Sequence, residues 1–316
     1  MSVGRRGVVG AVLVVGLGCE TCQSGDVASL VRRFAPGKPV ESFSIQEAGG
    51  SIKSITRGVE VARDLWATIA GASRVPVRLE ELVVATQCGE TDASTDTVAN
   101  PAIGAVADDV VRAGGTVLLG ETPEWMGVAA VLATRARDAA TGDRLLNVVA
   151  NYRRGALAIG ASVIGPEGDD DVLAGHVTAE GRALGCVAKG GTSPINEVLD
   201  FGVRPSGRGL AVMDTPSHDV VSITAMAAAG AQVCLFATGR GTPVGSALMP
   251  VIKVTGNART ASRMADNVDI AFGGVDQSLD AQMLRNSFAA VISGEEVVAE
   301  VIGQQDFAIH RVAPTV

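Results

Sequence analysis

The 316-residue chain has few aromatic residues, an odd number of cysteines and no cluster of basic side chains. Because Phe, Trp and Tyr make up only 3% of the residues, the core must rest on aliphatic side chains. Five cysteines in a chain of this length are not the even framework of a small disulfide-rich domain. The net charge of -8 and the lack of a basic tract argue against nucleic acid as a partner, because phosphate binding requires clustered Lys and Arg.

The apolar run near the N-terminus is too short to cross a bilayer. Residues 8–17 follow Arg5 and Arg6, as in a signal peptide, but Gly10 and Gly16 interrupt the run. The residue three positions before Cys19 is Gly16, whereas a lipoprotein cleavage site usually has Leu there. We therefore predict a buried strand that ends in a turn, a cytoplasmic protein and no membrane partner.

Short apolar runs that end in polar or glycine-rich residues are the main pattern of this sequence. With 47% hydrophobic residues and 39 glycines, this pattern is typical of buried parallel strands whose carboxyl ends lead into functional loops. We predict an α/β fold with mainly parallel sheets flanked by helices, a Rossmann-like three-layer sandwich. The predicted strands cover residues 11–15, 81–86, 115–119, 209–213, 232–236 and 249–254.

Helical spacing of apolar residues lies between these runs. Helices are predicted at residues 52–71, 100–113, 123–138, 222–230 and 280–292. The polar stretch at residues 164–176 predicts a surface loop. In domain terms, we interpret residues 1–35 as the last strand and turn of a preceding α/β region. Residues 36–316 then form a second α/β domain, with two lobes that divide near residues 164–180.

Two segments near the N-terminal half carry side chains suited to metal or anion binding. Cys19 and Glu20 follow the first strand, where a thiol and a carboxylate can ligate a metal, although two adjacent residues are a weak signal. Cys88 and Asp92 lie on a strand-to-helix loop that leads to Asn100. The free N–H groups at a helix start can hold an anion. Ordinary helix capping also accounts for Asn100, but not for the other two residues.

Two later segments place polar side chains directly after apolar runs. Lys189, beside two glycines, can approach an anion, or it is simply an exposed lysine before a turn. Asp214 and Thr215 follow the run at residues 209–213, and His218 comes three residues later. A histidine there is a candidate general base, although a histidine in a turn often has no function.

Arg240 lies in a glycine-flanked loop after the run at residues 232–236. A guanidinium between glycines can grip a carboxylate in bidentate fashion while the backbone closes around it. Lys253 lies inside an apolar run, where desolvation would make it a base at neutral pH, unless it pairs with a buried acid. The neighbouring candidates for orienting substrate hydroxyls are Thr238, Gly239, Gly241 and Asn257.

Taken together, these segments resemble the altronate and galactarate dehydratase family, which includes the large subunit of sulfolactate sulfo-lyase. The sequence has no nucleophile elbow, dinucleotide fingerprint or phosphate-binding loop. The motifs that carry the resemblance run through most of the chain and are GLGCE, EAGGS, CGETDAS, ANPAIG, GGTVLLGETPE, VAKGGTSP, MDTP, FATGRGTPVG and PVIKVTGN.

The resemblance implies a carbon–oxygen lyase that dehydrates a sugar acid to a 2-keto-3-deoxy acid with the help of Fe²⁺ or Mn²⁺. In that setting, we expect Lys253, His218, Arg240 and Asp214 to serve in catalysis. Cys19, Glu20 and Cys88 would face the metal. The expected substrate-binding residues are Asp92, Asn100, Lys189, Thr215, Thr238, Gly239, Gly241 and Asn257.

The alternatives are a sulfo-lyase large subunit and a non-catalytic anion-binding relative. Family members usually carry a further α/β region before the GCE segment, and often a small N-terminal domain. We therefore expect a hydroxy-acid as substrate, a homo-oligomer, and either a small partner subunit or a missing N-terminal region.

Overall fold

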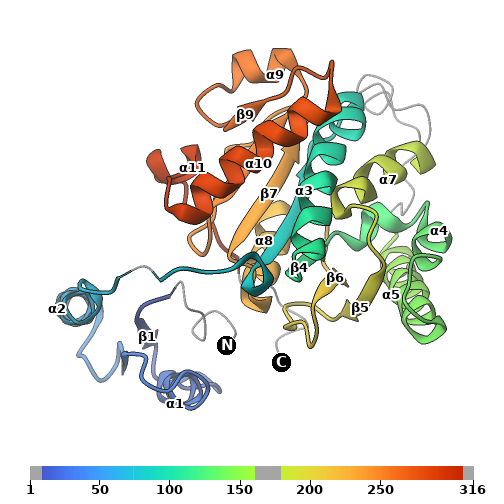
Figure 1. Ribbon diagram of the computed structural model, residues 1–316. Helices are drawn as coiled ribbons and strands as arrows, with labels where there is room; N and C mark the ends of the chain where they lie inside the picture. Colours follow the sequence, from blue (N-terminus) through green and yellow to red (C-terminus); the bar gives the residue numbers. More distant parts are fainter. Residues whose placement is uncertain (1–8, 74, 161–178, 309–316) are drawn as a thin grey trace. The chain divides into compact units, whose positions relative to one another are not determined.

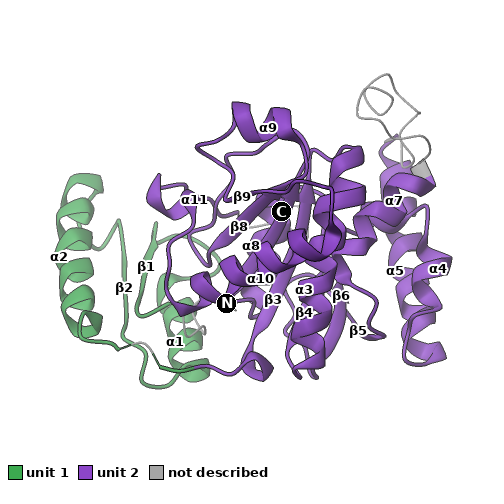
Figure 2. Ribbon diagram, turned by 45° about the horizontal axis from the view of Figure 1, so that its top comes forward, with its two compact units in different colours: residues 1–76 green, residues 77–316 purple. Residues whose placement is uncertain are grey.

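The computed structural model describes residues 9–73, 75–160 and 179–308, which form two compact units. Unit 1 covers residues 1–76 and unit 2 covers residues 77–316 (Figure 2). The predicted boundary at residues 35–36 lies inside unit 1, because the segments on either side of it pair with each other there. The predicted lobe boundary near residues 164–180 lies almost entirely outside the described residues.

Unit 1 is built on two parallel strands. β1 (Val12–Gly16) pairs with β2 (Val40–Ser44), and α1 (Ser24–Phe34) connects them. Val31 and Ala28 of α1 pack with Val40 in a small core. α2 (Ser51–Ile69) follows, as the helical spacing of residues 52–71 predicted.

The described residues of unit 2 form a seven-stranded parallel sheet in the order β5-β6-β4-β3-β7-β8-β9. From the middle outwards, the strands on one side are β3 (Val83–Gly89), β4 (Thr116–Leu119), β6 (Gly209–Met213) and β5 (Ile195–Leu199). Those on the other side are β7 (Val233–Thr238), β8 (Val251–Thr255) and β9 (Ile270–Ala271). The buried strands are nearly all apolar because helices cover both faces of the sheet.

Two separate cores show the layers. On one face, α3 (Asn100–Arg112) and α10 (Gln277–Ser293) pack against alternate residues of β3, β7 and β8 (Figure 1). On the other face, α8 (Asp219–Ala229) packs against the intervening residues, among them Ala85 and Phe236. The predicted α/β three-layer architecture is therefore confirmed.

Further elements of unit 2 lie between these strands and helices along the chain. They are η2 (Leu79–Glu81), η3 (Thr95–Ala99), η4 (Thr122–Trp125), α4 (Ala129–Ala133), α5 (Ala139–Ala158), α7 (Ala179–Val187), η5 (Ala188–Gly190), α9 (Ala258–Arg263) and α11 (Val298–Val301). The single helix predicted for residues 123–138 is wrong, because η4 and α4 divide it and a further helix starts at Ala139. Asp138 caps that further helix by accepting a hydrogen bond from the N–H of Thr141. In the part of the chain that the structure describes, no helix is both long enough and apolar enough to span a bilayer.

Candidate functional site

The carboxyl end of β3 is the point where the order of the strands reverses. The chain continues from β3 to β4 on one side of it, and later returns to place β7 on the other side. In open α/β sheets, ligands bind outside the carboxyl ends of the strands at such a switch point. The residues at this end of β3 are Gln87, Cys88 and Gly89.

A buried ionic cluster lies at this edge of the sheet. The ammonium nitrogen of Lys189 is 2.9 Å from a carboxylate oxygen of Glu121 and 3.0 Å from the sulfur of Cys88. The backbone N–H of Cys88 donates to the same Glu121 oxygen at 3.0 Å. Lys189 and Glu121 are fully buried, and Cys88 is 3% exposed. We refer to Cys88, Glu121 and Lys189 as the buried cluster.

Burial and charge pairing shift the pKa values of the cluster. Burial alone lowers the pKa of Lys189, but the neighbouring Cys88 and Glu121 outweigh it and raise that pKa well above its usual value. Burial raises the pKa of Glu121 to about 7, although Lys189 opposes the shift. Lys189 is therefore a permanent cation in a water-excluded setting, where its field is stronger than in water.

Backbone geometry presents Glu121 to the cluster. It follows β4 and Gly120 with φ at 74°, a left-handed conformation that costs a non-glycine residue free energy. The hydroxyl of Thr215 accepts a hydrogen bond from the N–H of Glu121 at 2.7 Å and so fixes this conformation. A Cβ on Gly120 would lie 2.8 Å from that hydroxyl, so a side chain there would displace it.

Lys189 is positioned by close packing of η5 against α3. A Cβ on Gly104 of α3 would lie 2.2 Å from the carbonyl oxygen of Ala188. The absence of a side chain at Gly104 therefore allows the backbone of η5 to rest directly on α3. Cys186, one turn before Lys189, donates to a carboxylate oxygen of Glu124 at 3.3 Å.

Gln87 connects the buried cluster to Asp219. Its amide nitrogen donates to Glu121 at 2.7 Å and to Asp219 at 3.1 Å. Among the described residues, its amide oxygen has no hydrogen-bond partner, although the side chain is fully buried. A buried acceptor is costly to leave without a hydrogen bond. The Gln87 oxygen can therefore accept one from a ligand or a water.

Asp219 gives the protein a pH-dependent stability. Burial raises its pKa from 3.8 to about 6; hydrogen bonding from Gln87 and the charge of His218 oppose the shift, while Glu90 and Glu124 add to it. The folded protein thus retains a proton that the unfolded chain releases above pH 3.8. The free energy of unfolding is expected to fall by up to about 3 kcal/mol as the pH rises through this window. Denaturant titrations of the unsubstituted protein and of Asp219→Asn test this, and parallel pH profiles would contradict it.

Asp92, Asn257 and Gly239 meet in a second group of polar residues. The amide nitrogen of Asn257 donates to Asp92 at 2.6 Å, and Ser94 and Thr95 donate to the other carboxylate oxygen. These hydrogen bonds outweigh burial and lower the pKa of Asp92. A Cβ on Gly239 would lie 2.6 Å from the Asp92 carboxyl carbon. The group therefore ties together the loops after β3, β7 and β8.

Arg240 lies at the same edge of the sheet, two residues after the end of β7. Its backbone N–H donates to the carbonyl of Glu90, and its guanidinium is 3.6 Å from the Glu90 carboxylate. The side chain of Arg240 is 49% exposed. Thr238 and Gly241 shape this loop, since the Thr238 hydroxyl accepts from the N–H of Gly241 at 3.0 Å.

Among the described residues, no hydrogen bond joins Lys253 to the buried cluster. Its ammonium donates to the carbonyls of Thr242 and Val244 at 3.3 and 3.0 Å, and burial lowers its pKa. Its side chain is fully buried. In this structure Lys253 therefore ties the loop after Gly241 to β8.

The remaining predicted residues lie on two segments, the loop between β6 and α8 and the start of α3. Asp214 accepts a hydrogen bond from the Thr122 hydroxyl at 2.6 Å, and His218 is exposed at the N-cap of α8. Asn100 is fully buried and donates to the carbonyl of Gly185 at 3.0 Å. The carbonyl oxygen of the Asn100 side chain has no hydrogen-bond partner within the described ranges.

The residues predicted to face a metal do not form a ligand set within either unit. Cys19 is exposed in unit 1, and the Glu20 carboxylate accepts the backbone N–H groups of Leu17 and Gly18. The sulfur of Cys88 in unit 2 is 3.0 Å from the ammonium nitrogen of Lys189 and 3.5 Å from a carboxylate oxygen of Glu121. No three His, Cys, Asp or Glu side chains of the described residues gather closely enough to hold an ion.

The sequence analysis missed Gln87, Glu121, Cys186 and Asp219. Glu121 lies within GETPE, one of the motifs that carried the resemblance, and a Gly-Glu pair directly after an apolar run was the available signal. Gln87 directly precedes Cys88, which was identified. Sequence reasoning had no comparable signal for Asp219, because it joins the site through the fold.

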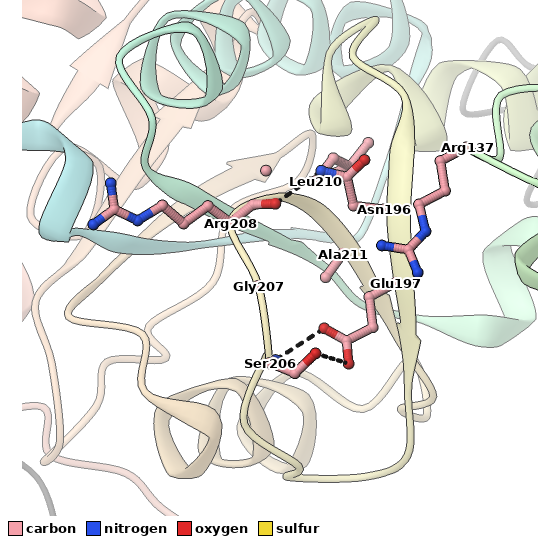
Figure 3. Close-up of a pocket in the computed structure, with 9 residues that line it drawn as sticks. Arg137, Asn196, Glu197, Ser206, Gly207, Arg208, Leu210 and Ala211 are labelled. Carbon is pink, nitrogen blue, oxygen red and sulfur yellow. Dashed lines mark hydrogen bonds between the residues drawn. The ribbon is translucent and has the colours of Figure 1, made fainter.

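A separate pocket of 230 Å³ lies at the amino ends of β5 and β6, the edge opposite to the buried cluster (Figure 3). Arg137, Glu197 and Arg208 are among the residues that line it. Each charge is already engaged: Arg137 pairs with Asp138, Arg208 with Glu80, and Glu197 accepts two hydrogen bonds from Ser206. The polar groups described above do not line this pocket.

The fold is a parallel sheet between two layers of helices. Acids, a buried ammonium group and an exposed arginine gather at its switch point, which is typical of an α/β enzyme. The model of the C-terminal region of D-galactarate/altronate dehydratase matches residues 79–315. The model of the second domain of D-galactarate dehydratase/altronate hydrolase matches residues 3–70. The chain belongs to the D-galactarate/altronate dehydratase family, which confirms the resemblance inferred from its motifs.

Individual relatives agree with this membership. Altronate dehydratase of Escherichia coli is 32% identical over 85% of this chain and 53% of its own length. Galactarate dehydratase (L-threo-forming) of the same organism is 34% identical over 92% of this chain and 54% of its own length. The beta subunit of (2R)-sulfolactate sulfo-lyase of Chromohalobacter salexigens is 31% identical over 96% of this chain and 79% of its own length. The chain thus spans about half the length of the two dehydratases.

Proposed function

We propose that this chain carries the catalytic edge of a lyase that removes water from a sugar acid of the altronate or galactarate type, giving a 2-keto-3-deoxy acid. The observation that carries the proposal is the buried cluster at the switch point, in a chain whose named relatives include dehydratases of these two acids. The cluster supplies a fixed positive charge where the reaction develops negative charge.

The chemistry requires such a charge. Removal of the proton next to a carboxylate gives an enediolate-like dianion, which preorganised cationic groups stabilise. We propose that Arg240, which is half exposed and flanked by glycines, binds the substrate carboxylate. The buried positive charge of Lys189 at the same edge of the sheet adds to the stabilisation of this dianion. The carbon–oxygen bond then breaks, and the enol product tautomerises to the keto acid.

For the proton acceptor, we propose His218 rather than Lys253. His218 is exposed in the loop between β6 and α8, at the edge where the buried cluster lies. The Lys253 ammonium is instead bound by two main-chain carbonyls. Asp214, Thr215 and Thr238 remain proposed to orient substrate hydroxyls, together with the backbone of Gly239 and Gly241.

A sulfo-lyase of the sulfolactate type is the second candidate. It is favoured by coverage, because the match spans 79% of the sulfo-lyase beta subunit but about half of each dehydratase. It would release sulfite and involve a partner subunit. The homo-oligomer, the cytoplasmic location and the Fe²⁺ or Mn²⁺ ion remain predictions for both candidate functions.

A substrate panel tests the proposal. Anaerobic protein with Fe²⁺, with Mn²⁺ or with chelator is incubated with altronate, galactarate and sulfolactate, and the 2-keto-3-deoxy acid and sulfite are measured. We expect turnover of one panel member and a loss of about 10²-fold or more in Arg240→Ala, since a bidentate carboxylate contact is removed. Arg240→Ala should leave the unfolding free energy nearly unchanged because its ion pair is exposed.

The other results are equally informative. Dependence on added ion and loss with chelator would support the metal prediction. Sulfite release would favour the second candidate. Silence across the panel, with no ion bound, would favour a non-catalytic anion-binding relative.

A further inference from the structure

Asp219 lies at the switch point of the sheet, and the chemistry proposed above gives it no role. It is the first residue of α8, and its backbone follows the β6 loop that contains Asp214 and His218. Both carboxylate oxygens lie against Gly89, the last residue of β3, where a Cβ would come within 2.8 Å of each of them. The carboxylate therefore lies directly over the end of the strand at the switch point.

Asp219 differs from Glu121 in its access to solvent. Glu121 is fully buried and is held by Lys189, Gln87 and the backbone of Cys88. Asp219 is of intermediate exposure, and in the part of the chain that the structure describes its one side-chain hydrogen bond comes from Gln87. One of its oxygens is therefore available to a group that arrives from outside.

Gln87 couples the two acids. The same amide nitrogen donates to Glu121 and to Asp219, so it holds the Asp219 carboxyl in a fixed orientation. Burial raises the pKa of Asp219 to about 6, with Glu90 and Glu124 adding to this and His218 opposing it. A carboxyl in this state can both hold and release a proton near neutral pH.

We propose that Asp219 is the acid that protonates the departing hydroxyl group in the elimination. This inference rests on the proposed function. The base takes the proton from the carbon next to the substrate carboxylate. Its electron pair forms the carbon–carbon double bond, and the carbon–oxygen bond breaks. The Asp219 carboxyl donates its proton to the leaving oxygen, so that water departs and a carboxylate remains on the enzyme.

The test separates the two halves of the reaction in D₂O. Proton abstraction alone exchanges the substrate proton for deuterium, whereas elimination gives the 2-keto-3-deoxy acid, and NMR follows both with galactarate and altronate. For Asp219→Asn we expect elimination to fall by about 10²–10⁴-fold, while exchange into recovered substrate continues. Gly89→Ala, whose methyl group would push the carboxylate aside, should show the same imbalance more weakly.

Asp276→Asn is the matched control, because it removes an exposed acid at the N-cap of α10 and leaves a residue that also caps helices. It should retain both exchange and elimination. If Asp219→Asn eliminates at the rate of the unsubstituted protein, or loses exchange and elimination equally while still folded by circular dichroism, the inference is overturned. If the unsubstituted protein does neither on either acid, the proposed function itself fails and takes this inference with it.

Discussion

Replacing Lys189 with Met is expected to lower the free energy of unfolding by about 3–5 kcal/mol, because it leaves the fully buried Glu121 beside no cation. The side chains are similar in length, so the loss reports the charge rather than a cavity. Activity on the panel substrate should also disappear, since the field that stabilises the dianion is gone. Chemical denaturation measures the first effect and the panel assay measures the second.

A double variant separates charge from packing. In Lys189→Met/Glu121→Gln both ionised partners are removed, and replacing a whole buried pair is often nearly neutral. We therefore expect the double variant to regain most of the stability that the single variant loses, but none of the activity. If Lys189→Met alone is as stable as the unsubstituted protein, the ion pair at 2.9 Å contributes nothing and the assignment of the cluster is wrong.

Gly104→Ala is expected to be the second severe change. The added Cβ would lie 2.2 Å from the carbonyl oxygen of Ala188, a backbone atom that cannot rotate away. Either α3 or η5 must shift, which costs about 1–3 kcal/mol in a packed core. Because the next residue along η5 is Lys189, the shift should also reduce turnover.

Gly155→Ala is the matched control for this change. Gly155 lies in α5, and apart from its chain neighbours and the nearby backbone of its own helix no atom lies within 4 Å of the position of its Cβ. Alanine there should stabilise the helix by about 0.5–1 kcal/mol and leave turnover unchanged. Thermal unfolding with the panel assay distinguishes the two variants. A Gly104→Ala protein that is as stable and as active as Gly155→Ala would show that η5 tolerates displacement.

The strands of the sheet were the most predictable part of the fold. The apolar run at residues 209–213 coincides with β6, and the runs at residues 115–119 and 249–254 overlap β4 and β8. These strands are buried on both faces, so their composition alone marks them. β5 was not predicted, because its sequence INEVL, at the edge of the sheet, has two adjacent polar residues and so shows neither an apolar run nor an alternating pattern.

The candidate site was predictable only where chemistry and a loop signal coincide. Cys88, Lys189 and Arg240 were chosen because they follow apolar runs or lie between glycines, and the structure places all three near the end of β3 or β7. Lys253 was chosen for its burial, but burial alone does not say which acceptors surround an ammonium group. Asp219 reaches the site through Gln87, a contact between residues 132 positions apart, and no local pattern encodes it.

The separation of the cluster along the chain bears on how the protein is made. Cys88 and Lys189 lie 101 positions apart, so Cys88 and Glu121 are synthesised well before Lys189. Contacts of this range also form late in folding, since long loops must close first. A nascent chain that closed β3 against β4 early would enclose an acid without its partner. The pairing of Glu121 with Lys189 therefore makes the centre of the sheet depend on the docking of η5, a segment that lies between β4 and β5 in the chain.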